Sequence, residues 1–220
     1  TIKGGSSERI GSVIIKQEGD TYYGVAQHSI AELYGMSDGD VSKVGYAQVT
    51  ALCSGGAILT DQTASIYTVT GDSVLSLGET ISLNGAVKTV KNVNRFVLDE
   101  FEVIKENETI EYPTPEDVTY SISTTSFDQA TYVTLSGSLI GTEVRVGGYS
   151  VQLFDPAESV NIDPVDLHKV TVTGYAVGKE IVAISVADNG ADDSLIPYPV
   201  KYLVRVSGIN FSTETFSETS

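Results

Sequence analysis

Alternating apolar and polar residues, broken at short intervals by Gly, Asn, Asp or Pro, run through most of this chain. Thr, Ser, Val, Ile, Tyr and Gly dominate, and this mix favours pleated, half-buried strands joined by turns. Hydrophobic residues make up 41% of the 220 residues, which is enough apolar material for one large or two small folded domains. The sequence therefore predicts an all-β globular protein.

The first half is predicted to hold a hairpin, a short helix and five strands. The hairpin pairs residues 12–17 with residues 21–25. Residues 29–34 are the best helix candidate, because Ser29 can cap the helix and Glu32 completes a capping box. Closing the five strands into a small barrel removes the exposed edges that invite aggregation. These strands are expected at 41–52, where Gly45 eases a bend, 57–60, 65–69, 80–87 and 95–104.

The second half repeats the first in outline. The polar segment 105–117, with Pro113 and Pro115, has the composition of a linker. Strands are expected beyond it at 130–139, 143–146, 149–154, 169–177 and 180–186, and 200–206 is one more strand that can close a second barrel. Two stretches match between the halves: 57–61 with 151–155, and 81–87 with 170–176. Such internal similarity indicates duplicated modules.

These observations predict two tandem small β-barrels with a short N-terminal hairpin and helix segment. The expected boundaries are 1–40 for the hairpin and helix, which pack on the first module, 41–112 for the first barrel, 113–211 for the second, and 212–220 for a mobile tail.

The charge balance limits the classes of partner. Against 13 Lys and Arg residues stand 29 Asp and Glu residues, a formal net charge of −16. Such a surface repels phosphate backbones and anionic membranes, so nucleic acid is an unfavourable partner. No run approaches the roughly 18 apolar residues that a membrane helix needs. Cys53 is the one cysteine, so no intrachain disulfide forms, and its position beside an apolar strand predicts a small buried hydrophobe.

Part of the first half follows a known arrangement. A strand ends in Asp61, a short turn leads to an Ile66-Tyr67 strand, and a segment of alternating hydrophobic residues runs from Gly78 to Gly85. This arrangement resembles the OB-fold-like modules of exported bacterial proteins. The second half is similar but departs from it, with Asp166-Leu167-His168 where a Gly-Glu pair would stand.

The resemblance implies two OB-fold-like barrels and an exported protein of the periplasm or outer cell surface. Many such proteins are lipoproteins of unassigned role, and the fold does not fix an activity. The chain begins at Thr1 rather than Met, which indicates a processed or truncated form, and a lipid anchor upstream of Thr1 fits that expectation.

OB barrels commonly bind ligands along the face of their second and third strands and the adjoining loops. In the first module, the loop between the fourth and fifth strands would be 88–94. The candidate ligand-binding residues form a cationic and aromatic groove suited to stacking a base or a sugar: Tyr46, Tyr67, Lys88, Lys91 and Arg95. The alternative is a hairpin with solvated lysines and core tyrosines.

Other chemistry receives less support. The acidic turns 38–40 and 188–193 carry the oxygen ligands that calcium prefers, but Asp, Asn and Gly are also the usual turn residues. His28 and His168 lie far apart in sequence, and no nucleophile elbow, zinc helix or phosphate loop is present. We therefore expect no enzyme, no metal and no cofactor.

The function expected from the sequence is a non-catalytic binding module with a protein or glycan ligand. Two alternatives stay open. One is single-stranded oligonucleotide binding through residues 88–95. The other is a structural component of a surface appendage built from β-sandwich domains, which would have two stacked open sheets in place of closed barrels.

Overall fold

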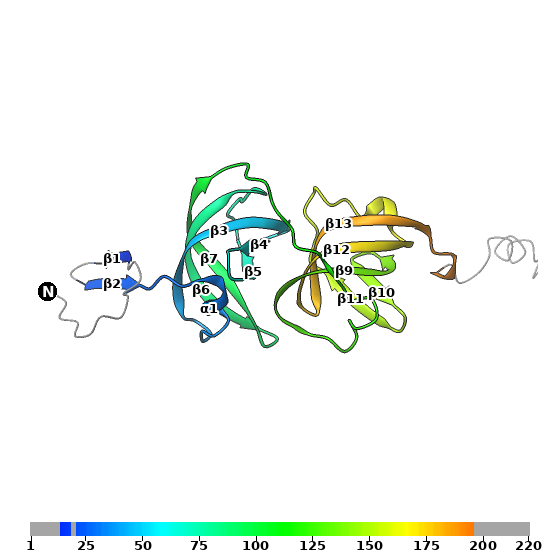
Figure 1. Cartoon of the computed structure of the whole chain (residues 1–220), viewed down its shortest axis with the longest axis horizontal. Helices are drawn as coiled ribbons and strands as arrows, with labels where there is room; N and C mark the ends of the chain where they lie inside the picture. Colours follow the sequence, from blue (N-terminus) through cyan, green and yellow to red (C-terminus); the bar gives the residue numbers. More distant parts are fainter. Residues whose placement is uncertain (1–13, 19–20, 196–220) are drawn as a thin grey trace, which may run out of the picture.

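The computed structural model describes residues 14–18 and 21–195 and consists mostly of β-strands, as the sequence predicts (Figure 1). Two sets of five strands lie side by side, and a separate hairpin precedes them (Figure 1). The strand ranges expected from alternation agree with the observed ones to within a few residues, because one face of almost every strand is buried.

Five strands form a closed barrel in the order β3-β4-β5-β7-β6. All neighbours in this ring are antiparallel except β5 and β7, which are parallel. The bend expected at Gly45 is present as a register shift between Val44 and Ala47 in the pairing of β3 with β6. The strands are β3 (Val41–Cys53), β4 (Gly56–Thr60), β5 (Ser65–Val69), β6 (Thr80–Val90) and β7 (Val93–Lys105).

The short helix α1 (Ile30–Leu33) completes the core of this first barrel. Ser29 caps the helix and forms the predicted capping box with Glu32. Ile30 and Leu33 are fully buried with the inward-facing residues of the strands, such as Phe96. A helix of one turn has little stability of its own, so this packing holds it.

A second set of five strands, which we call the second module, repeats the pairing scheme of the first barrel. β9 pairs with β10, β10 with β11, β11 in parallel with β13, β13 with β12, and β12 with β9. Its core is a separate cluster that includes Leu135, Leu139 and Ile181. The strands are β9 (Phe127–Ile140), β10 (Glu143–Val146), β11 (Tyr149–Leu153), β12 (His168–Gly178) and β13 (Glu180–Ala191), with the 3-10 turns η1 (Asp163–Val165) and η2 (Asp193–Leu195) beside them.

One of the two sequence matches between the halves joins equivalent positions, and the other does not. Gly85 and Gly174 both stand at a register shift where the fourth strand of a module pairs with the fifth. In contrast, Asp61 follows the second strand of its module, whereas Asp155 follows the third. The second match was misleading because short alternating strands resemble one another wherever they occur.

The segment that links the modules is held against the first barrel. After β7, Gln48 of β3 donates to the carbonyl oxygen of Thr109, and the hydroxyl of Tyr112 donates to the carbonyl oxygen of Thr50. β8 (Glu116–Asp117) then pairs in parallel with β9. The prolines end regular pairing here, as expected, but side-chain contacts keep the segment from being a free spacer.

The N-terminal hairpin is formed by β1 (Ile14–Glu18) and β2 (Thr21–Val25). It stands apart from the barrel in Figure 1, and α1 after it supplies Ile30 and Leu33 to the core of the first module. The predicted strand 200–206 and the predicted tail 212–220 lie outside the described residues.

Candidate functional site

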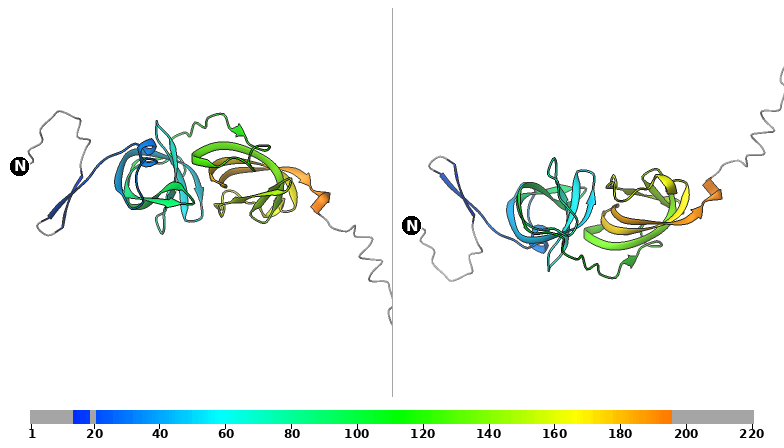
Figure 2. Two further views of the ribbon diagram at one scale, coloured as in Figure 1. Left: turned by 90° about the horizontal axis from the view of Figure 1, so that it is seen from below. Right: turned by 90° about the horizontal axis from the view of Figure 1, so that it is seen from above.

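The two modules lie side by side (Figure 2), and a third apolar cluster, which lies outside both cores, contains residues of both. The first barrel contributes outward-facing side chains of β3, β4, β5 and β7, and the second module those of β9, β12 and β13. No buried member is more than 8% exposed, so the modules are joined by a packed interface. We call this cluster the junction, and its buried members are Ala51, Cys53, Ile58, Tyr67, Val93, Ala130, Tyr175, Val177 and Val182.

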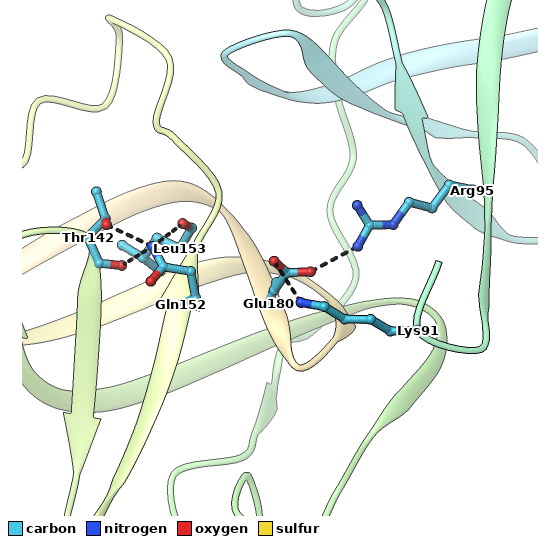
Figure 3. Close-up of polar contacts among 6 residues, drawn as sticks. All are labelled: Lys91, Arg95, Thr142, Gln152, Leu153 and Glu180. Atoms are coloured by element: carbon cyan, nitrogen blue, oxygen red, sulfur yellow. Dashed lines mark hydrogen bonds and ion pairs between the residues drawn. The ribbon is translucent and has the colours of Figure 1, made fainter. Parts of the chain in front are cut away.

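Arg95 carries the charge at the edge of the junction. Its side chain is 12% exposed, and Nη2 donates to Oε2 of Glu180 at 2.9 Å (Figure 3). Nζ of Lys91 lies 3.5 Å from the other oxygen of the same carboxylate. One acidic side chain of the second module therefore binds two cations of the first barrel, and the predicted pair Lys91 and Arg95 is partnered within the chain.

Two aromatic rings extend the contact inward from Arg95. Tyr67 of the first barrel stacks on Phe154 of the second module, with ring centroids 4.5 Å apart. The Arg95 guanidinium lies 5.1 Å from the Tyr67 centroid and 5.3 Å from that of Phe154. Arg95 therefore binds the second module through a hydrogen-bonded ion pair with Glu180 and through the ring of Phe154, while it also contacts Tyr67 of its own barrel.

Cys53 lies in the same apolar environment. Its sulfur is 3.9 Å from the hydroxyl of Tyr67. Burial raises the pKa of the Cys53 thiol to about 11, and burial likewise raises the pKa of Tyr67. The predicted buried, unreactive cysteine is confirmed as far as its burial is concerned.

The remaining two predicted ligand-binding residues lie elsewhere. Nζ of Lys88 is 3.2 Å from a carboxylate oxygen of Asp38, within the first barrel. Tyr46 on β3 is 66% exposed and does not belong to the junction, where Tyr67 is buried. The expected loop 88–94 is also shorter than predicted, because β6 and β7 continue to a two-residue turn at Lys91 and Asn92, both with positive φ.

Tyr46 borders a surface hollow of about 510 Å³ on the first barrel. The hollow lies between the segment before α1, the bend in β3 and the turn between β4 and β5. Polar side chains line it, both uncharged, such as Gln27 and Gln62, and acidic, namely Glu32 and Asp61. An exposed aromatic ring beside convergent polar groups is the composition of a ligand site rather than of a core.

Asp61 fixes the wall of this hollow. Its carboxylate accepts hydrogen bonds from the backbone amides of Ile30 at 2.8 Å, Thr63 at 2.7 Å and Ala64 at 3.0 Å. Burial on its own would raise the pKa of Asp61, but these hydrogen bonds outweigh it and lower the pKa below the usual value. Asp61 therefore joins the helix to the turn between β4 and β5.

The histidines and acidic turns make local contacts. His28 Nδ1 lies 2.9 Å from the Ser42 hydroxyl, and His168 Nδ1 lies 2.8 Å from Asp188, in different modules. Asp38 accepts from the backbone of Thr89. Within residues 14–18 and 21–195, no group of three or more His, Cys, Asp or Glu side chains is arranged to hold a metal ion.

No sequence motif indicates which residues of the second module contact Arg95 and Tyr67. Glu180 and Phe154 lie in the second half and were not singled out. A signal did exist in the uninterrupted apolar run 57–59, since a strand buried on both faces loses its alternation.

No protein-family model matches the chain, and no curated protein matches it. In the described part of the chain, no helix is long and apolar enough to cross a membrane.

Proposed function

We propose that this chain is a non-catalytic binding unit of an exported protein, located in the periplasm or at the outer cell surface. In this proposal two OB-like barrels form one body, and the ligand is a glycan or a protein. The single observation that carries the proposal is the hollow beside Tyr46, and its lining favours a glycan. The ring of an exposed tyrosine offers a flat apolar face to a sugar, while amide and hydroxyl groups can bind the sugar hydroxyls.

The shared pairing scheme supports the OB-like assignment of both modules. In each one, five strands pair in the same cyclic order with a single parallel contact, between the third and fifth strands. The face along which OB barrels usually bind is that of the second and third strands. In the first barrel that face holds Ile58 and Tyr67, which the second module covers. A ligand of this barrel therefore needs another surface, and the Tyr46 hollow is available.

The two alternative functions draw less support. Oligonucleotide binding relied on Lys88, Lys91 and Arg95, and all three cations are paired with carboxylates of the same chain. The surface-appendage alternative relied on two stacked open sheets, whereas the strands pair in rings.

The test is a glycan array probed with the purified protein and with Tyr46→Ala. We expect the substitution to weaken binding about tenfold, which is the loss of roughly 1.4 kcal/mol of ring contact. Tyr120→Ala is the matched control, because Tyr120 is 96% exposed and does not line the hollow. Equal binding by all three proteins would contradict a glycan site at Tyr46.

A further inference from the structure

The first strand of each module pairs with both of its neighbours at a single residue. In β3 this residue is Gln48, which stands opposite Thr60 on β4 and Thr80 on β6. In β9 it is Ser138, which stands opposite Arg145 on β10 and Lys169 on β12. We call Thr60, Gln48 and Thr80 the first row, and Arg145, Ser138 and Lys169 the second row.

Both rows face outward. Gln48 lies between the buried residues Ala47 and Val49, and Ser138 is followed by the buried Leu139. Residues directly opposite each other on paired strands project from the same face of the sheet. The rows are therefore equivalent outer surfaces of the two modules, and they differ in chemistry: the first is neutral, and the second carries two cations.

An acidic segment of the same chain lies on the first row. The hydroxyl of Thr80 donates to Oε2 of Glu108 at 2.5 Å, and the amide of Gln48 donates to the carbonyl oxygen of Thr109 at 3.2 Å. Nζ of Lys105 lies 2.9 Å from the other oxygen of Glu108. On this outer surface, the chain's own segment thus presents a carboxylate to Thr80 and a carbonyl oxygen to Gln48.

One residue of the second row, Ser138, also binds a carboxylate of the same chain. The hydroxyl of Ser138 donates to Asp192, the residue after β13, which takes the part that Glu108 takes after β7. Hydrogen bonds from Ser138 and Ser194 lower the pKa of Asp192, and the charge of Lys169 contributes to the shift. Asp192 therefore satisfies Ser138 and lies within electrostatic reach of Lys169.

Arg145, in the same row, differs from Ser138 in its contacts. Within residues 14–18 and 21–195, its side chain forms no ion pair and no hydrogen bond. In contrast, Lys88, Lys91, Arg95 and Lys105 each have a carboxylate oxygen between 2.9 and 3.5 Å away. Of the two arginines in the described part of the chain, Arg95 is paired and Arg145 is not, and Lys43, Lys169 and Lys179 also lack an ion pair there.

A hollow of about 350 Å³ lies over the second row. Arg145 and Lys169 line it from opposite sides of β9, and Ser136 and Asn189 add polar groups. Two strand spacings separate the cations, about 10 Å, so a carboxylate placed between them can interact with both long side chains.

We propose that the second row binds an acidic peptide segment of a partner protein, whose carboxylate pairs with Arg145 and is assisted by Lys169. The internal precedent is the acidic segment on the first row, and the charge of Arg145 supplies the complement. A strongly polyanionic ligand is disfavoured, because Asp192 lies alongside and the whole molecule repels each added negative charge. This site is independent of the glycan proposed at Tyr46.

The experiment uses two labelled peptides: residues 106–111 of this chain, Glu-Asn-Glu-Thr-Ile-Glu, and the same peptide with every Glu replaced by Gln. Fluorescence anisotropy with the full chain is expected to show saturable binding of the acidic peptide that weakens as salt is raised. Arg145→Gln should weaken this binding about tenfold, the value of one charge-assisted hydrogen bond. Lys169→Gln should have a smaller effect, because the carboxylate of Asp192 already interacts with the positive charge of Lys169.

Lys43→Gln is the control, since it removes one positive charge from the first barrel, away from the second row. It should leave binding unchanged. The proposal is overturned if the acidic peptide does not saturate, if the Gln peptide binds equally well, or if Lys43→Gln weakens binding as much as Arg145→Gln. It is also overturned if an oligouronate binds at Arg145 more tightly than the peptide, since the site would then be one for acidic glycans.

Discussion

At the scale of single residues, a few polar side chains decide how the segments are joined. Asp61 accepts hydrogen bonds from both α1 and the turn between β4 and β5. Glu180 binds Arg95 and Lys91 across the junction. The sequence drew attention to Asp61, Lys91 and Arg95 but not to what they bind, because a hydrogen-bond partner far along the chain leaves no local pattern.

The hydrogen bonds to Asp61 predict a pH dependence of stability. Because its pKa is lowered in the folded protein, this carboxylate contributes stability that is complete above the unfolded pKa of about 3.9. The contribution is lost as the pH falls through the folded pKa. Asp61→Asn should therefore cost about 1–2 kcal/mol in urea unfolding at neutral pH and nothing at the acid end.

Asp128→Asn provides the comparison for that series. Asp128 is exposed on β9 and its carboxylate forms no hydrogen bond within the described residues, so its variant should unfold like the parent at every pH. A constant difference between Asp61→Asn and the parent across the pH range would refute the role given to Asp61.

At the scale of elements, two glycines allow the fourth and fifth strands of each module to approach closely. A Cβ at Gly85 would lie 2.1 Å from the carbonyl oxygen of Val97, and a Cβ at Gly174 would lie 2.1 Å from that of Val182. These atoms belong to partner backbones, so the strands would have to separate. The sequence repeat around these glycines therefore has a steric cause shared by both modules.

We expect Gly85→Ala and Gly174→Ala each to destabilise its own module by about 2–3 kcal/mol, the usual cost of overpacking. Thermal unfolding followed by circular dichroism measures the loss. Gly148→Ala should stay within about 0.5 kcal/mol of the parent, since a Cβ there meets no atom within 4 Å. Equal stability of Gly85→Ala and Gly148→Ala would show that the strands adjust freely.

At the scale of the whole molecule, the junction makes one body of two modules. Buried apolar residues from both sides pack with Tyr67, Phe154 and Arg95. We expect a packed interface of this kind to couple the unfolding of its two parts, since separating them would expose its buried apolar surface. Cys53, the single cysteine, lies inside the junction, so the reactivity of its thiol measures how readily the junction opens.

Phe154→Ala should weaken the junction while leaving both module cores intact, because Phe154 packs against the junction cluster. We expect calorimetry to change from one unfolding transition to two. We also expect Cys53 to react at least about tenfold faster with iodoacetamide near pH 8, since transient opening exposes the thiol. Tyr120→Ala, which removes an exposed ring, should alter neither measurement. A parent protein that already unfolds in two steps would rule out this coupling.

Local sequence patterns predicted the β class, most strand positions, the capping of α1 and the buried state of Cys53. Each of these follows from local chemistry: alternation places one face of a strand inward, and a serine followed three residues later by glutamate closes a helix end. The tertiary structure alone decided where the predicted groove residues went. Tyr67, Lys91 and Arg95 were brought to a contact between modules, and Tyr46 was left exposed on another face. The reason is that the partner of an outward-facing residue depends on how the folded modules dock. Docking in turn depends on surfaces that distant segments of the chain assemble.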